Sequence, residues 1–222
     1  FAFFDSAQFI NKGLLPIRDY WTSNGIMIDF IQSYLFKILG VSWSVYLLHS
    51  SLINFIFSFL TYIFFKSQGL NSSLALFYSI SISILAYPSS GVPFPDHHSI
   101  LLSLIGIYLL IFAIKNNKNY IWFVIPIIFF VAFLCKQVPS AFFVILISIY
   151  ALTLSIRNND YYKFIPLIIS LIFSLSVFFL FLTINNIEIK SFFIQYIFFP
   201  LTIGGERSSN ANFFNLILMF VK

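Results

Sequence analysis

Two carboxylates in the first forty residues have the type and spacing for acid–base chemistry. Asp5 lies in the phrase FFDSAQF, and Asp19 follows fourteen residues later in PIRDYW. Two carboxylates near one pocket can divide the work, because one can act as general base on an acceptor hydroxyl while the other binds a cation or the acceptor. Arg18 directly precedes Asp19, so a structural ion pair between them is the alternative. We therefore take Asp5 and Asp19 as candidate catalytic residues and Arg18 as a candidate substrate ligand.

A second polar phrase, Asp96-His97-His98-Ser99, stands at the start of an apolar run. Asp and His are ordinary metal ligands, so Asp96 and His97 are candidates for holding a divalent ion or, with His98, a substrate. Neighbouring helical residues point about 100° apart, so the two histidines do not readily share one ion. The alternative is that Asp96 caps the following helix. The phrase is similar to the Asp-His-His-Cys of protein palmitoyltransferases, but Ser99 replaces the nucleophile and the cysteine-rich zinc region is missing, which excludes that class.

Two basic residues are candidate ligands for an anionic group. Lys136 stands between two apolar runs with almost no loop around it, and such a charge near hydrocarbon usually has a partner or a task. A phosphate would suit it, while snorkelling of its side chain to the interface is the alternative. Arg207 follows the pair Gly204-Gly205 in a long polar segment and could close over an anionic leaving group.

Composition places the chain in a membrane. It is 60% hydrophobic with a mean hydropathy of +0.96, well above the share of about 45–50% in soluble domains. The single cysteine, Cys135, excludes an intramolecular disulfide and a cysteine-based zinc cluster. A net charge of +5, scattered along the chain, excludes nucleic acid as a partner. The chain begins with Phe1 and stops inside an apolar run, so we expect it to be a piece of a longer protein.

The apolar runs predict an all-α, polytopic bundle with six full spans and the beginning of a seventh, since a span needs about 20 mostly apolar residues. The predicted spans are Ser44–Phe65, Ser72–Tyr87, Ser99–Ile114, Tyr120–Cys135, Pro139–Ile156 and Phe164–Ile184, and the cut-off run begins near Phe213. Residues 1–43 are expected to form an extracytoplasmic first loop, in which 25–39 is an interfacial helix. Residues 44–222 are expected to form the bundle, with an outer loop at 185–212 and an amphipathic run at 191–199 lying along the membrane surface.

The charge pattern predicts how the loops alternate. If the first loop is outside, the inner loops are 66–71, 115–119 and 157–163, which hold five basic residues against one acid, Asp160. The short outer loops hold one base, Lys136, and this bias follows the positive-inside rule. Six of the seven acids then lie on the outer face: Asp5, Asp19, Asp29, Asp96, Glu188 and Glu206. The pattern favours a site lined by acids on the outer face, although loops that merely carry charge are the alternative.

The opening segment resembles the first extracytoplasmic loop of GT-C membrane glycosyltransferases, and the bacterial relatives of dolichyl-phosphate-mannose–protein mannosyltransferases (glycosyltransferase family 39) are most similar. In those proteins an acid follows the first membrane helix, and a phrase G-x-x-P-Y-R-D leads to a surface helix. Here the phrase is Gly13-Leu14-Leu15-Pro16-Ile17-Arg18-Asp19, with Ile17 in place of Tyr, and Ser6 follows Asp5 where a second acid is frequent. The resemblance implies an inverting transfer of a sugar from a polyprenyl-phosphate donor on the periplasmic face of a bacterial inner membrane. It assigns the base to Asp5, the acceptor and donor sites to Asp19 and Asp96, and the lipid phosphate to Lys136 and Arg207.

Three other classes remain open from the sequence. A transporter or flippase for a lipid-linked or small anionic substrate would place ionisable residues deep within spans, often with an internal repeat, and neither is evident. An O-antigen polymerase or ligase would use an Arg-rich outer loop, where this chain offers Arg207. A purely structural membrane subunit is the third. The sequence names neither the sugar nor the acceptor, and the expected partners are a polyprenyl-phosphate sugar and membrane lipids.

Overall fold

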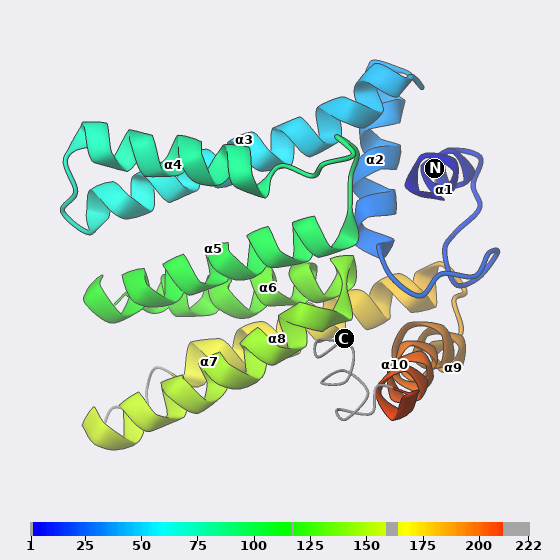
Figure 1. Cartoon of the computed structure of the whole chain (residues 1–222). Helices are drawn as coiled ribbons and strands as arrows, with labels where there is room; N and C mark the ends of the chain where they lie inside the picture. The colour runs from blue at the N-terminus through cyan, green and yellow to red at the C-terminus, as the bar shows by residue number, and fades with distance from the viewer. Residues whose placement is uncertain (1, 117, 159–163, 211–222) are drawn as a thin grey trace, which may run out of the picture.

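The structure is a bundle of long helices whose one end is covered by shorter ones. This computed structural model describes residues 2–116, 118–158 and 164–210, and within them all regular secondary structure is helical. Figure 1 shows the long helices running side by side, while α2 lies across their ends together with α1, α9 and α10. We call the covered end of the bundle the capped end and the other the far end.

The six apolar runs all form helices, as predicted. They are α3 (Trp43–Ser67), α4 (Ser72–Ala86), α5 (Pro95–Asn116), α6 (Asn119–Cys135), α7 (Gln137–Asn158) and α8 (Phe164–Ile184). Among the described residues, α3, α5 and α8 are long and apolar enough to cross a membrane, whereas the apolar parts of α4, α6 and α7 are shorter. The chain is therefore compatible with a membrane protein, and the count of six spans stays a prediction. The seventh run, from Phe213, lies outside the described residues.

Side-chain caps fix where two of these helices begin. The hydroxyl of Ser42 accepts a hydrogen bond from the backbone N–H of Val45, and the amide oxygen of Asn71 accepts one from Leu74. Each cap satisfies a backbone donor that the first turn of a helix leaves open. Between α6 and α7 the chain has only Lys136 as a connection, so these two helices are antiparallel neighbours that meet at the capped end.

The covering helices form a layer that we call the cap layer. It consists of α1 (Ala2–Asn11), the first loop at 12–25, α2 (Ile26–Leu39), α9 (Ile189–Phe192), the π-helical turn η2 (Phe193–Phe198) and α10 (Phe199–Asn210). The predicted helix at 25–39 is confirmed as α2. Helix α1 was not predicted, and residues 189–210 are helical throughout, so less of the expected outer loop at 185–212 is irregular than the sequence suggested.

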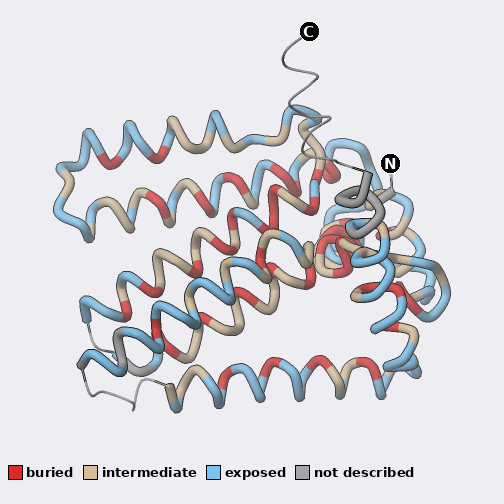
Figure 2. Tube along the Cα trace, turned by 60° about the horizontal axis from the view of Figure 1, so that its bottom comes forward, coloured by how far each residue is buried: buried red, intermediate tan, exposed pale blue. Residues whose placement is uncertain are grey.

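The cap layer is joined to the bundle by a shared apolar core. Ile17 and Ile26 of the cap layer pack in one cluster with Leu134 of α6 and Phe178 of α8. On the other side of α2, Phe4 packs edge-on against Phe36 and Tyr46. Figure 2 shows buried positions on the inward faces of the helices and exposed ones outside. Each fully buried apolar side chain contributes about 1.5–3 kcal/mol, so the cap layer is firmly seated on the bundle.

The described acids gather at one end of the bundle, whereas bases lie at both ends. The acids whose side chains are described all belong to the cap layer or to the helix start at the capped end: Asp5, Asp19, Asp29, Asp96 and Glu188. The described bases of the connecting segments at the far end are Lys66, Lys115, Lys118 and Arg157. Asp160 lies outside the described residues. The predicted inner loops 66–71 and 115–119 lie at the far end and the candidate site residues at the capped end, while the sides of a membrane that these ends face stay a prediction.

Candidate functional site at the capped end

Two predicted site residues, forty positions apart, meet in an ion pair. The Lys136 Nζ lies 2.6 Å from Asp96 Oδ1 and 2.7 Å from Oδ2. Both side chains are about a third exposed, at 31% and 37%. The pair is positioned because Ser99, one turn into α5, donates its hydroxyl to the backbone carbonyl of Lys136 at 3.1 Å. An ammonium has three N–H donors, so one remains for an oxygen of a ligand.

The residue after Lys136 ties this junction to the cap layer. The side-chain amide of Gln137 donates to the backbone carbonyls of Ser23 at 2.7 Å and Tyr196 at 2.6 Å. The backbone N–H of Gly25 donates to the carbonyl of Cys135 at 2.8 Å. The first loop, η2 and the α6–α7 junction therefore form one connected structure around Lys136.

Asp5 is the most available carboxylate of the site. It lies in the first turn of α1, where its side chain is exposed. Among the described residues, no hydrogen bond or ion pair to its carboxyl is present. A carboxylate near a helix N-terminus is stabilised by the helix dipole, and an exposed one is open to an acceptor hydroxyl. The exposure of Asp5 leaves it open to a ligand, and its role as general base stays a prediction.

Asp19 is held by its neighbours. Its Oδ2 accepts from the backbone N–H of Leu15 at 2.7 Å and from Arg18 at 2.8 Å. The hydrogen bonds from Arg18, followed by that from Leu15, lower the pKa of the Asp19 carboxyl below its usual value. Arg18 also donates to the backbone carbonyls of Asn185 at 2.9 Å and Gly13 at 3.2 Å. This is the structural ion pair that the sequence left as the alternative, and it fastens the first loop to the end of α8.

The turn that precedes Arg18 and Asp19 contains a strained residue. Ile17 has a φ of 73°, a left-handed conformation that is rare for a β-branched side chain. Its side chain is buried, its N–H donates to the carbonyl of Tyr20 at 2.9 Å, and its carbonyl accepts from Gln195 at 3.1 Å. Such strain costs about 1–3 kcal/mol and persists where the surroundings enforce it. The turn is therefore a rigid part of the cap layer.

A hydrogen-bonded chain runs from α2 through α3 to α5. The Gln32 Oε1 lies 2.9 Å from His49 Nδ1, and His49 Nε2 lies 3.1 Å from His98 Nε2. His98 Nδ1 lies 3.0 Å from the carbonyl of Phe94, which only accepts, so this nitrogen carries the proton. A neutral His98 then accepts at Nε2 and His49 donates from its Nε2, which leaves His49 Nδ1 facing the Gln32 Oε1. The Gln32 Nε2 is buried without a hydrogen-bond partner, and turning the amide by 180° would point its N–H at His49 Nδ1.

This chain determines what the Asp-His-His phrase can do. His98 is fully buried with both ring nitrogens engaged, so it links helices and leaves no nitrogen for a ligand. The buried ring of His97 lies beside the backbone of Ala86 at the end of α4, and Asp96 faces Lys136. Within the described residues, no three His, Cys, Asp or Glu side chains are grouped closely enough to hold a metal ion. Of this phrase, Asp96 is the residue that the structure exposes for binding.

Asp29 is a buried carboxyl that the sequence analysis did not select as a site residue. It lies on the buried face of α2, one turn from Gln32, and its side chain is 1% exposed. Its Oδ1 has no hydrogen-bond partner, and burial raises the pKa of this carboxyl to about 8. The signal in the sequence was present, because Ile28, Asp29, Gln32 and Phe36 share one face of an amphipathic helix. Arg207 lies on α10, but its side chain is outside the described part.

An apolar groove leads from this end into the bundle. It has a volume of about 510 Å³ and lies between α6, α7 and α8. Phe133 and Ala141, within about a turn and a half of Lys136 along the chain, line its capped end, and Trp122 and Phe164 line its other end. The groove therefore runs along the bundle, and its lining ends before Lys136, whose side chain faces Asp96 on α5.

Comparison with known proteins adds no assignment: no family model, curated protein or solved structure matches the chain. The resemblance of the first loop to GT-C glycosyltransferases thus stays a prediction from the sequence. What the structure contributes is the placement of Asp5, Asp96 and Lys136 at one end of an apolar bundle.

Proposed function

We propose that this chain belongs to a membrane glycosyltransferase that moves a sugar from a polyprenyl-phosphate donor to an acceptor hydroxyl at the capped end. The observation that carries the proposal is the Lys136–Asp96 pair at the capped end of a bundle that also holds an apolar groove of about 510 Å³ between α6, α7 and α8. A polyprenyl phosphate has a long apolar tail and one anionic head. The groove suits the tail, and Lys136, five residues before the lining residue Ala141, suits the anionic head. The proposal includes a GT-C-like bundle of six spans in a bacterial inner membrane, with the capped end outside.

In this proposal Asp5 acts as general base. It removes the proton of the acceptor hydroxyl, and the resulting oxygen attacks the anomeric carbon from the face opposite the phosphate. The bond from the anomeric carbon to the phosphate oxygen breaks, the phosphate keeps the electron pair, and the anomeric centre inverts. The remaining N–H of Lys136 donates to the phosphate where negative charge develops, which is how a fixed donor lowers a barrier. Asp96 holds the ammonium in place. No step needs a nucleotide or a metal ion.

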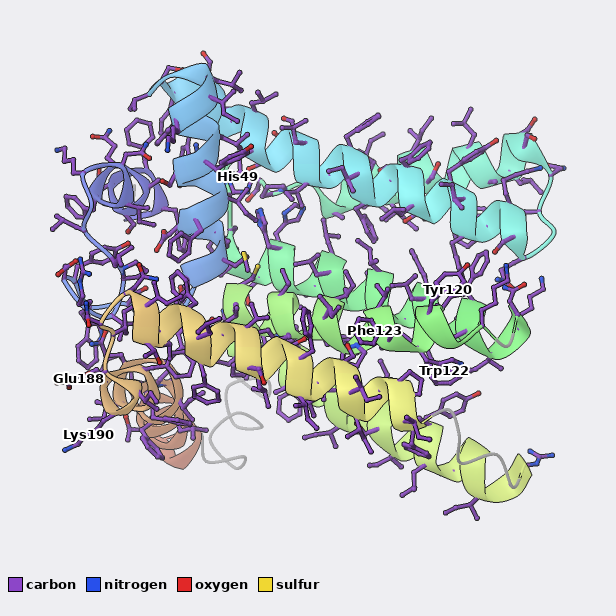
Figure 3. All side chains as sticks on the ribbon, turned by 180° about the vertical axis from the view of Figure 1, so that it is seen from behind. His49, Tyr120, Trp122, Phe123, Glu188 and Lys190 are labelled. Atoms are coloured by element: carbon purple, nitrogen blue, oxygen red, sulfur yellow. The ribbon has the colours of Figure 1, made fainter. Side chains whose placement is uncertain are left out.

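The test is transfer of label in liposomes. The protein is reconstituted with a radiolabelled polyprenyl-phosphate sugar, and movement of label from lipid to acceptor is followed. We expect turnover by the wild type and a loss of about 10²–10⁴-fold in Asp5→Asn, the usual contribution of a positioned base. Glu188→Gln is the matched control, because Glu188 is another exposed acid of the capped end (Figure 3). Equal turnover by Asp5→Asn would move the base elsewhere, and no turnover of any of a panel of donors would overturn the proposal.

Transport is the second candidate, and the buried histidines are the observation that bears on it. Ionisable residues inside spans mark transport pathways. His49 is the seventh residue of α3 and His98 the fourth of α5, so both lie near the capped end (Figure 3). At about 1.5 Å per residue His49 is roughly 9 Å from its helix start, well short of a midplane site. The geometry therefore favours transfer over transport, and counterflow of lipid-linked sugar across liposomes would reverse that preference.

A further inference from the structure

The far end of the bundle carries a second groove with a basic mouth. This groove has a volume of about 310 Å³ and lies between α3, α5 and α6. Its apolar walls include Leu60, Phe64, Ile105 and Tyr108, and Asn116 and Lys118 line the end nearest the connecting segments. Figure 3 shows Tyr120, another lining residue, at the opposite end of the bundle from His49. The groove is thus separate from the site around Lys136.

The charge around the mouth has one sign. Lys66 ends α3, Lys115 lies in the last turn of α5, and Lys118 precedes α6. Lys115 donates to the backbone carbonyl of Ser67 at 2.7 Å and Lys66 to the hydroxyl of Ser72 at 3.1 Å, so each ammonium keeps further N–H donors. Among the described residues, the far end has no acid to neutralise them. A basic mouth on an apolar groove fits an anionic amphiphile.

The length of the groove fits one leaflet. From Ile105 to Asn116 the α5 wall spans eleven residue steps, or about 16 Å at about 1.5 Å per residue. Half of a hydrocarbon core of about 30 Å is about 15 Å. An acyl chain lying in this groove would therefore extend from the headgroup level to the bilayer centre. Partly exposed lining residues such as Ile63 leave its side open to lipid.

We propose that this groove binds the acyl chain of an anionic phospholipid from the leaflet at the far end, with the headgroup phosphate held by Lys115 and Lys118. Basic pockets between membrane helices on the positive side bind anionic headgroups in this way. The side chain of Asn116, exposed at the mouth, adds an amide donor beside the two ammonium groups. The bound lipid holds the ends of α3, α5 and α6 together, where packing alone leaves an open groove. The proposal is independent of the glycosyltransferase proposal.

Native mass spectrometry of the detergent-solubilised protein tests it, with titration of dioleoyl-phosphatidylglycerol and, separately, dioleoyl-phosphatidylcholine. We expect retained phosphatidylglycerol adducts, and little retention of phosphatidylcholine. Each lysine near an anionic headgroup is worth about fivefold in affinity, so Lys115→Gln with Lys118→Gln should weaken retention by about 25-fold. Lys12→Gln with Lys37→Gln, two exposed lysines of the cap layer, is the matched control and should leave retention unchanged.

A second variant separates the groove from the charges. Ile63→Trp fills the groove from its exposed rim and keeps both lysines, and it should also release phosphatidylglycerol. Three results would overturn the proposal: equal retention of the two lipids by the wild type, retention of phosphatidylglycerol by the double lysine variant, and displacement of that lipid by polyprenyl phosphate. The last would show that the groove belongs to a lipid carrier.

Discussion

Asp29→Asn should stabilise the folded protein, and more so as the pH rises. Asp29 is 1% exposed, and desolvation raises the pKa of its carboxyl from the usual 3.8 to about 8. A carboxyl whose pKa is higher in the folded than in the unfolded protein costs nothing below the unfolded-state pKa, where both states hold the proton. As the pH rises from the unfolded-state pKa to the folded-state pKa, the stability of the fold falls progressively. Asp29 therefore lowers the free energy of unfolding by its full amount above about pH 8 and not at all below about pH 4. Asparagine has nearly the same shape and does not ionise.

The size of the effect follows from the gap between the two pKa values. At about 1.36 kcal/mol per unit of pKa, the gap from 3.8 to about 8 corresponds to roughly 6 kcal/mol. A chain of this size shifts its Tm by about 2–4 °C per kcal/mol, so the full effect is on the order of 10 °C. The phenol groups that interact electrostatically with Asp29 are those of Tyr20, Tyr46 and Tyr196. Burial raises the pKa of Tyr20 and of Tyr196, so both stay neutral across the range.

The assay is thermal unfolding in detergent at pH 4 to 9 for the wild type, Asp29→Asn and Asp5→Asn. The difference in Tm between Asp29→Asn and the wild type should grow between pH 4 and pH 8 and then level off. Any constant cost of placing an amide at this buried position cancels in the pH dependence. Asp5→Asn is the control, because the same substitution is made there at an exposed carboxyl. A difference that is flat with pH, or that falls as the pH rises, would refute the reasoning.

Three further predictions concern packing and the ion pair. Gly106→Ala should lower the Tm, because a Cβ there meets the ring of Phe129 on α6. Gly204→Ala on α10 is the control, since its Cβ meets nothing, and it should be neutral or stabilising. Thermal unfolding followed by circular dichroism distinguishes the two variants, and equal effects on the Tm would contradict the packing. Arg18→Gln should make residues 12–25 more sensitive to limited proteolysis, since it removes the hydrogen bonds to Asp19 and to the Asn185 carbonyl. Lys12→Gln is the control and should leave the cleavage pattern unchanged. An unchanged pattern in Arg18→Gln would contradict the role of Arg18 in linking this loop to the end of α8. Lys136→Met should abolish sugar transfer if Lys136 binds the phosphate, with Lys190→Met as the exposed control at the same end (Figure 3), and retained transfer would refute that role.

The sequence predicted the helices well because hydrophobicity dominates a membrane chain. Each of the six apolar runs is a helix, and α2 lies across the bundle as its weak, charged pattern indicated. Helix α1 was not predicted, because the segment FFDSAQF drew attention for its carboxylate. Its apolar residues Phe3, Ala7 and Ile10 nevertheless recur at helical spacing. The gathering of the described acids at one end was also predictable, since it follows from counting acids in alternate loops.

Pairings across the chain were beyond the sequence because they depend on how helices meet. Spacing along the chain suggested Asp5 with Asp19, whereas the structure joins Asp96 to Lys136 and gives Asp19 to Arg18. The Asp-His-His phrase shows why: one side chain faces the α6–α7 junction, the next faces α4, and the third faces His49. Consecutive helical positions point about 100° apart, so one phrase serves three separate neighbours. His98 and Gln32 orient His49 between two helices, and this buried polar chain determines how α2 lies on the bundle. Because α1 packs on α2, the position of α2 in turn determines where the exposed carboxylate of α1 can reach.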